Sequence, residues 1–402
     1  MHDVQSFGGV VLAWGLVGTA ALLAHRIAKV IRIPAPALFL IGAAVASTHV
    51  KAIRDAVDLH RAENIVTLAL IVILFDGGLH LGGRRIRDAA APVLLLGVVG
   101  TFATTGLIAV FAHFGFGLDW KFSLVLGAAL APTDPAVVFA VLATQRLPGR
   151  TSAILEGESG FNDPAGIALL LGFVHLATHP NGSIAALFGT FAAAMLVGSG
   201  LGVLGGYVLR WFLGTQPLRG TSQQSLFALA GVVALYGVTT VAHGSGFLAV
   251  LIAGVVMGDL RRPLDRAVEH FHATLASLGE IVAFVVLGVT VALRTLTVGH
   301  AWLIGLGIFA VLTFVLRPLV CFPLLAAVRL PRRDATFVAW AGLKGAVPLL
   351  LGALAVSGGV PDAHRLYAIV FVVVALSVVI QGGSLPWVAR KLALDVDDVE
   401  PQ

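Results

Sequence analysis

Apolar residues form long runs along the chain, separated by short polar breaks. The runs lack the period-two alternation of membrane β-strands, and most approach the roughly 20 residues that an α-helix needs to cross a bilayer. The pattern therefore predicts an all-α polytopic membrane protein with about 13 transmembrane helices. The thirteen runs cover approximately residues 8–24, 34–49, 62–81, 89–113, 121–143, 152–177, 184–213, 224–242, 244–258, 268–292, 300–327, 335–356 and 365–389.

Lys and Arg residues are concentrated in every second break. Of the 26 cationic side chains, 18 fall in one set of breaks and six in the alternate set, while Arg317 and Lys344 lie inside apolar runs. Loops rich in Lys and Arg stay in the cytoplasm. We therefore expect a multi-pass protein of the inner (plasma) membrane. Its N-terminus would lie outside and its C-terminus in the cytoplasm, as an odd number of spans requires.

The composition agrees with a lipid environment. Hydrophobic residues make up 58% of the 402 residues and charged residues 12%, whereas soluble domains carry roughly 25% charged residues. The net charge of +5 comes from the short loops, so it does not indicate nucleic-acid binding. The single cysteine, Cys321, excludes an intrachain disulfide and is expected to be a buried thiol.

The polar segments are too short for a soluble domain. We assign residues 1–392 to one transmembrane domain and residues 393–402 to a short cytoplasmic tail. The N-terminus lacks the basic region of a signal peptide, so the first run is expected to be a permanent span. No phosphate-binding loop with Gly-Lys-Ser/Thr occurs in the chain. Transport would therefore be driven by an ion gradient and would need no cofactor.

Ionisable residues inside a span are functional candidates, because each costs several kcal/mol to place there. In the fifth run, Asp134 lies near mid-depth between Pro132 and Pro135. Each proline removes a donor and clashes with the carbonyl four residues back, so the helix should break here. The freed carbonyls beside Thr133 and Asp134 would form an oxygen site that suits Na⁺ or K⁺.

The sixth run carries a second polar group. Ser159 and Asp163 stand four residues apart and share a helix face, whereas Glu158 points elsewhere and needs a cationic partner. Pro164 frees the carbonyl four residues before it. Glu156 lies nearer the cytoplasmic end, where we expect it to be solvated.

The twelfth run repeats the features of the fifth. Lys344 stands between Gly342 and Gly345 with Pro348 four residues on, which weakens the helix at mid-depth. Two interrupted helices in different halves of a chain indicate an inverted-repeat transporter. A buried lysine must be paired or neutral, and we expect Glu158 to be its partner.

Three further charged residues lie inside spans. Asp76 in the third run precedes a Gly-Gly pair, and site residue and structural residue are nearly balanced interpretations. Arg317 with Pro318 in the eleventh run is expected to be structural or gating. Glu280 in the tenth run is a possible partner for Arg317, although no spacing fixes that pair.

Together these motifs resemble the monovalent cation:proton antiporter superfamily. The matching branch contains the bacterial and archaeal sodium/proton antiporters and is related to the eukaryotic sodium/hydrogen exchangers. The Asn-Asp-Pro continuation is most similar to the potassium/proton, cell-volume subgroup. The resemblance implies a core domain with crossed, interrupted fifth and twelfth helices beside a dimerisation domain, and hence a homodimer. The motifs that carry it are ILFDGGL (73–79), APTDPA (131–136), EGESGFNDPAG (156–166), RP (317–318) and WAGLKGAVP (340–348).

The resemblance also assigns roles to individual residues. It implies that Asp163 is the shared cation and proton site, with Asp134, Ser159 and Thr133 (largely through its carbonyl) as further ligands of Na⁺ or K⁺. Asp76 occupies the place of a glutamate ligand. Asn162 is typical of electroneutral members. Glu158 matches the acid that pairs with the basic residue of the Gly-Leu-Arg-Gly motif, which here is Lys344.

The sequence therefore predicts an electroneutral, one-for-one antiporter that works by alternating access. A monovalent cation and a proton would compete for Asp163, and the expected partners are these ions, the lipid bilayer and a second copy of the chain. One alternative is a K⁺-selective antiporter of the cell-volume type. Rivals from other classes are a cation channel and an intramembrane enzyme, although Ser159 and Asp163 have no histidine between them to act as a base.

Overall fold

The computed structural model describes residues 33–55, 57–134, 149–179, 183–215, 221–258 and 266–394, with isolated positions between 15 and 28 and at 138. Within these ranges the chain is helical and contains no strand. The α-helices are α2 (Ala35–His49), α3 (Lys51–Arg54), α4 (Leu59–Leu94), α5 (Thr101–Phe116), α6 (Trp120–Leu130), α8 (Gly149–Thr178), α9 (Ile184–Thr215), α10 (Thr221–Val241), α11 (Gly246–Gly258), α12 (Arg266–Thr290), α13 (Ala301–Val311), α14 (Arg317–Ala327), α15 (Arg332–Trp340), α16 (Ala346–Ser357), α17 (Ala363–Leu376) and α18 (Gly383–Lys391). Three π-helical segments (Leu95–Gly100, Leu312–Leu316 and Ser377–Gly382) and one 3₁₀ segment (Leu293–His300) continue these helices.

The helices have the length and composition of membrane spans. In the described ranges, eight helical stretches are long and apolar enough to cross a membrane, and α2, α6, α11 and α16 are shorter apolar helices. The all-helical membrane fold is confirmed, and the described parts of the second to thirteenth predicted runs are helical apart from the breaks in the fifth and twelfth runs and the ends of some runs. The first run, 8–24, and the end of the tail lie outside the described residues, so the count of thirteen stays a prediction.

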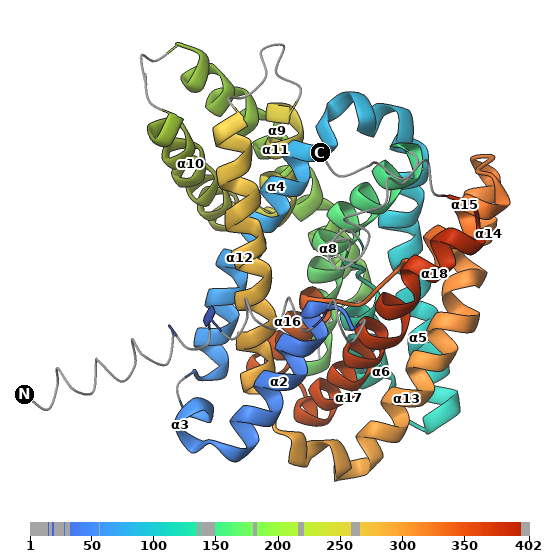
Figure 1. Cartoon of the computed structure of the whole chain (residues 1–402). Helices are drawn as coiled ribbons and strands as arrows, with labels where there is room; N and C mark the ends of the chain where they lie inside the picture. Colours follow the sequence, from blue (N-terminus) through green and yellow to red (C-terminus); the bar gives the residue numbers. More distant parts are fainter. Residues whose placement is uncertain are drawn as a thin grey trace, which may run out of the picture.

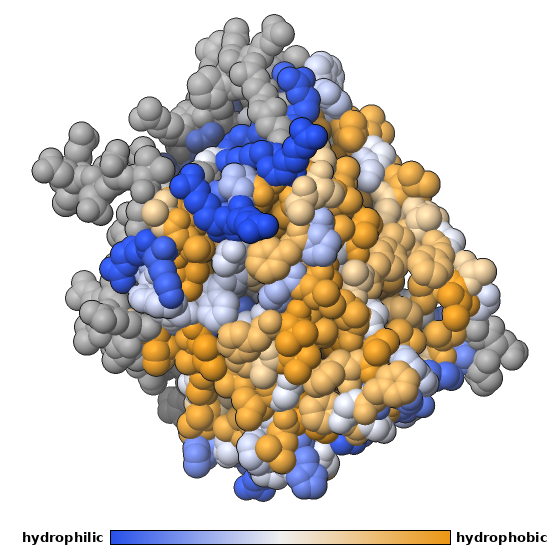
Figure 2. All heavy atoms as spheres, turned by 90° about the vertical axis from the view of Figure 1, so that its right-hand side faces the viewer, coloured by the Kyte–Doolittle hydropathy of each residue, from blue (hydrophilic) through white to orange (hydrophobic). Residues whose placement is uncertain are grey.

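The surface of the bundle is apolar over a wide area. Large apolar side chains are exposed along α13 and α14, and such a surface requires lipid or another apolar partner. Figure 2 shows this side of the molecule largely covered by hydrophobic residues, with hydrophilic ones gathered mainly at its upper left and lower edge. The exposed side chains include Leu306, Phe314, Val315, Leu319 and Phe322.

The helices form two groups, which Figure 1 shows side by side. In one group α11 and α12 pack against the first part of α4, α2 packs against α12, and α9 and α10 pack against α11. In the other group α5, α8, α16 and α17 pack against α6, and α13 packs against α17. Helix α4 belongs to both groups, because it bends at Gly82 (φ 56°, ψ 153°), in a region of φ/ψ space open to glycine.

Two helices are interrupted, as the sequence predicts. Helix α6 begins at an N-cap, Asp119, and ends at Leu130, just before Pro132. Helix α15 ends at Trp340, and α16 starts only at Ala346. The two breaks meet in the interior, because the backbone N–H of Asp134 donates to the carbonyl of Leu343 at 2.8 Å. The continuation of the fifth span, 135–148, is described only at position 138.

Candidate ion-binding site

The ends of the broken helices meet charges of the opposite sign. The ammonium group of Lys344 donates to the carbonyls of Ala131 and Pro132, both at 2.9 Å, at the negative C-terminal end of α6. A carboxylate oxygen of Asp134 accepts from the backbone N–H of Ala346 at 3.4 Å, at the positive N-terminal end of α16. Unpaired helix ends carry about half an elementary charge each. The two side chains therefore stabilise the crossing.

The close approach at this crossing depends on Gly345. A Cβ atom built on Gly345 would overlap the carboxylate of Asp134. Any larger residue would therefore push Asp134 away from the N-terminus of α16. The Gly-Leu-Lys-Gly motif (342–345) thus supplies a cation for one half-helix and room for an anion at the other.

Two polar residues of the thirteenth span hold the second break in place. The backbone N–H of Lys344 donates to the hydroxyl of Ser377 at 2.9 Å, and that hydroxyl donates to Gln381 at 2.7 Å. The amide of Gln381 in turn donates to the carbonyl of Trp340 at 3.0 Å. These bonds satisfy backbone groups that the interrupted helix leaves free. Our sequence reasoning missed both residues, although their i, i+4 spacing in an apolar run was a signal.

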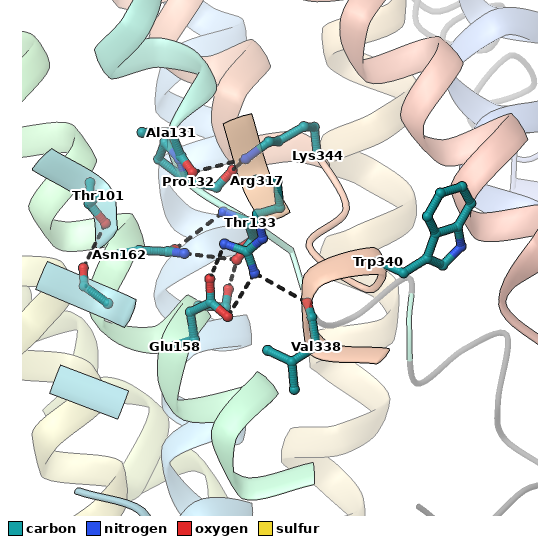
Figure 3. Close-up of polar contacts among 12 residues, drawn as sticks. Thr101, Ala131, Pro132, Thr133, Glu158, Asn162, Arg317, Val338, Trp340 and Lys344 are labelled. Carbon is teal, nitrogen blue, oxygen red and sulfur yellow. Dashed lines mark hydrogen bonds and ion pairs between the residues drawn. The ribbon is translucent and has the colours of Figure 1, made fainter. Parts of the chain in front are cut away.

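The buried ion pair of the site joins Glu158 to Arg317, not to Lys344. Two nearly parallel hydrogen bonds of 2.5 and 2.9 Å link the guanidinium to the carboxylate, and Arg317 also donates to the carbonyl of Val338 at 3.4 Å. Figure 3 shows this pair beside the crossing, with Lys344 pointing instead toward Ala131 and Pro132. Glu158 and Arg317 are 1% and 5% exposed.

The predicted pairing of Glu158 with Lys344 is therefore wrong, and so is the suggested pairing of Arg317 with Glu280. The reason is geometric. A planar guanidinium matches both oxygens of a carboxylate, whereas a compact ammonium suits two converging carbonyls. A fully buried arginine in the sequence needs a carboxylate partner, and this rule could have identified Glu158.

Residues of α8 fix the broken segment beside the crossing. The side-chain amide of Asn162 donates to the Thr133 hydroxyl at 2.7 Å and accepts from the Thr133 backbone N–H at 3.3 Å. The Ser159 hydroxyl donates to the Thr133 carbonyl and also neighbours Asp163. Asn162 therefore has a structural role, because it bonds both the backbone N–H and the hydroxyl of Thr133.

Asp163 differs from these partnered groups. It is 4% exposed, and its Oδ1 atom is buried without a hydrogen-bond partner. Among the described residues no ion pair involves Asp163. A buried carboxylate left in this state is costly unless a proton or a cation joins it.

A cavity of about 460 Å³ leads to Asp163. Asp134, Ser159 and Glu280 line it together with Asp163, and one side of α4 contributes Asp76. Asp76 thus shares the cavity with the other predicted site residues. In the described part of the chain, no three His, Cys, Asp or Glu side chains stand close enough to hold a metal ion together.

The mouth of the cavity carries both signs of charge. His80 and Arg85 are about half exposed there, and His80 lies 3.5 Å from the carboxylate of Asp76. Glu156, which we expected to be solvated, is largely buried, because its side chain is only 14% exposed and accepts a hydrogen bond from Ser152 at 2.7 Å. Access to Asp163 therefore passes between charged side chains.

Comparisons with known proteins agree with this architecture. The model of the transmembrane sodium/hydrogen exchanger family matches residues 17–391. The chain belongs to the sodium/hydrogen exchanger family.

Several relatives in this family carry names. The K(+)/H(+) antiporter NhaP of Alkalimonas amylolytica is 36% identical over 334 residues, which are 83% of this chain and 58% of the relative. The K(+)/H(+) antiporter NhaP2 of Shewanella sp. (strain MR-4) is 29% identical over 96% of this chain and 68% of its own length. The Na(+)/H(+) antiporter NhaP of Pseudomonas aeruginosa is 26% identical over 82% of this chain and 81% of its own length. The chain thus spans 58% of the length of its Alkalimonas relative.

A solved structure shares the fold. The sodium proton antiporter MjNhaP1 of Methanocaldococcus jannaschii superposes with a TM-score of 0.79 at 22% sequence identity, over 95% of this chain and 99% of that chain. At this identity the likeness establishes the exchanger fold.

The end of this exchanger bundle beyond the cavity floor is closed by contacts between the two helix groups. Ser357 at the end of α16 donates to the buried carboxylate of Glu63 on α4 at 2.5 Å. Tyr367 on α17 shares a 2.7 Å hydrogen bond with Thr290 at the end of α12. Sequence reasoning missed this layer, because its members are dispersed polar residues that only the tertiary fold brings together.

Proposed function

We propose that the chain is a secondary antiporter that exchanges a monovalent cation for protons at Asp163. The carrying observation is the balance of charge around the crossing. Glu158 is paired with Arg317, and Lys344 and Asp134 are matched to half-helix ends. Asp163 has no ion pair among the described residues, and its Oδ1 atom is buried without a hydrogen-bond partner.

In the proposed cycle, a proton and a cation bind Asp163 in turn, each excluding the other. Taking an empty carboxylate past an apolar barrier is costly, so the two helix groups would move against each other only when the site is loaded. One proton is then exchanged for one cation. The cycle is electroneutral, because Asn162 is neutral and Asp134 keeps its contact with α16 in both halves of it.

The proposed cation ligands are Asp163, Asp134, the Ser159 hydroxyl and the Thr133 carbonyl. Hydroxyl and carbonyl oxygens suit alkali cations. K⁺ is the first ion to test, because the relatives named as K(+)/H(+) antiporters are 36% and 29% identical and the one named as a Na(+)/H(+) antiporter is 26% identical.

We propose that the chain lies in the plasma membrane. In the proposed orientation, the arginine-rich loops between the spans face the cytoplasm. The cavity mouth, which carries His80 and Arg85, would then open toward the cytoplasm. The layer of Glu63 and Ser357 would close the outer side. A second copy of the chain is the proposed partner, as in the family resemblance.

The test is a pH-jump assay in proteoliposomes, run separately with K⁺, Na⁺ and Li⁺. Wild-type protein should dissipate the pH gradient on addition of at least one cation. Asp163→Asn should abolish this exchange for every cation, whereas Asp362→Asn, at an exposed position, should leave it unchanged.

Two outcomes would contradict the proposal. If folded Asp163→Asn protein keeps a tenth of the wild-type rate, Asp163 is not the shared site. If cation flux in the wild type proceeds without a counter-flux of protons, the chain is a channel. A clamped membrane potential should not change the rate, because an electroneutral cycle moves no net charge across the membrane. Any net charge moved would make the rate depend on potential, by about 2.3 kcal/mol per charge per 100 mV.

A further inference from the structure

Glu280 is a partly buried acid that the mechanism above does not use. One face of α12, marked by Ala273, Ala276, Ser277 and Glu280 at helical spacing, lines the cavity. The Oε1 atom of Glu280 is buried without a hydrogen-bond partner, and no ion pair of Glu280 occurs among the described residues. A carboxyl group in this position contributes nothing to stability, because burial of an unpaired acid is unfavourable.

The position of Glu280 relates it to the ion site. Glu280 lines the same cavity as Asp163 and Asp134, and its carboxylate is close enough to Asp134 for mutual repulsion. It comes from the other helix group, since α12 packs against α2 and the first part of α4, whereas Asp134 and Asp163 belong to the group around α6. Acidic residues from both helix groups therefore line the cavity.

We propose that Glu280 is an additional cation-attracting carboxylate of the transport site, supplied by the wall that faces Asp163. This inference rests on the proposed antiport function. Glu280 acts on the cation across the cavity rather than as a third carboxylate ligand, because the acidic side chains do not converge on one metal position among the described residues. The ligand is a monovalent cation that loses part of its hydration shell on binding.

The other charges of the cavity cannot replace this contribution. Asp76 and Glu156 lie toward the mouth, where His80 is 3.5 Å from Asp76 and Arg85 is 4.0 Å from Glu156. At an effective dielectric of about 20, a unit charge about 10 Å from a cation changes the cation's binding constant roughly tenfold. In assays at a pH high enough to ionise Glu280, removal of its charge should therefore weaken cation binding about tenfold and leave the saturated rate nearly unchanged.

The experiment compares Glu280→Gln with the wild type in reconstituted proteoliposomes, with exchange measured over a range of K⁺ and Na⁺ concentrations. The matched control is Glu269→Gln, which removes the same charge from an exposed position on the same helix. We expect a KM about ten times higher in Glu280→Gln and an unchanged KM in Glu269→Gln. Thermal unfolding in detergent should show Glu280→Gln to be at least as stable as the wild type.

Three results would overturn the inference. These are a wild-type KM in Glu280→Gln, loss of exchange that high cation concentration does not restore, and clear destabilisation, which would indicate a structural role. Glu280→Asp keeps the charge and should restore most of the affinity. Failure of the proposed function is distinguishable, because wild-type protein would then show no cation-dependent proton flux.

Discussion

The ion pair between Glu158 and Arg317 allows a quantitative test of the site's construction. Both side chains are almost completely buried, and two hydrogen bonds of 2.5 and 2.9 Å join them. Replacement of one partner leaves the other as an unpaired buried charge, which costs about 3–5 kcal/mol. Glu158→Gln and Arg317→Gln should therefore each destabilise the protein strongly.

The double substitution should be far milder than either single one. Two neutral amides replace two buried charges, and the bond from Arg317 to the carbonyl of Val338 is lost, at about 1 kcal/mol. The expected coupling energy is at least about 3 kcal/mol. As a control, Arg54 forms an exposed ion pair with Asp55. Arg54→Gln should change stability by less than about 1 kcal/mol.

Thermal and denaturant unfolding of the purified protein in detergent would measure this cycle. The wild type, the two single variants and the double variant must be measured in the same detergent, because the detergent that covers the apolar surface affects the measured stability. Additive effects of the two single changes would show that the residues do not act as a pair. In that case the placement of Arg317 and the correction of the Lys344 pairing would both be refuted.

Three further predictions follow from the crossing and from the closed end. Gly345→Ala should destabilise the protein by about 1–3 kcal/mol and abolish exchange, because its methyl group would overlap the carboxylate of Asp134; wild-type exchange in this variant would contradict the crossing geometry. Lys344→Met should cost about 2 kcal/mol or more in unfolding experiments, since two buried carbonyls lose their donor, and an unchanged unfolding midpoint would argue against that cap. Ser357→Ala should cost about 1–3 kcal/mol by removing the donor to the buried carboxylate of Glu63, and this effect should be smaller in a Glu63→Gln background, where the acceptor is uncharged.

The parts of the site that were predictable from the sequence are those with local causes. Pro132 removes a backbone donor wherever the chain carries it, and Gly342 and Gly345 weaken a helix without help from neighbours. The two helix breaks follow from these residues alone. The shared face of Ser159 and Asp163 follows from helical spacing, and both line the same cavity.

The choice of partners was not predictable in the same way. Glu158 has two candidate cations, Arg317 and Lys344, at nearly the same depth and far away in sequence. Which cation reaches it depends on the π-helical segment before Arg317 and on the free carbonyls at the end of α6. Neither feature is visible as a residue pattern, so the need of a buried lysine for a partner favoured Lys344 over Arg317.

The chemistry of the two cations explains why the site uses one of each. Arg317 serves a carboxylate, where its planar fork makes two parallel hydrogen bonds. Lys344 serves two carbonyls that converge on one point, which a compact ammonium fits and a guanidinium of greater width does not. Lysine in place of the arginine of the Gly-Leu-Arg-Gly motif is therefore no weakened form of a salt bridge. It caps the broken helix beside Thr133, and in the proposed cycle a transported ion balances the charge of Asp163.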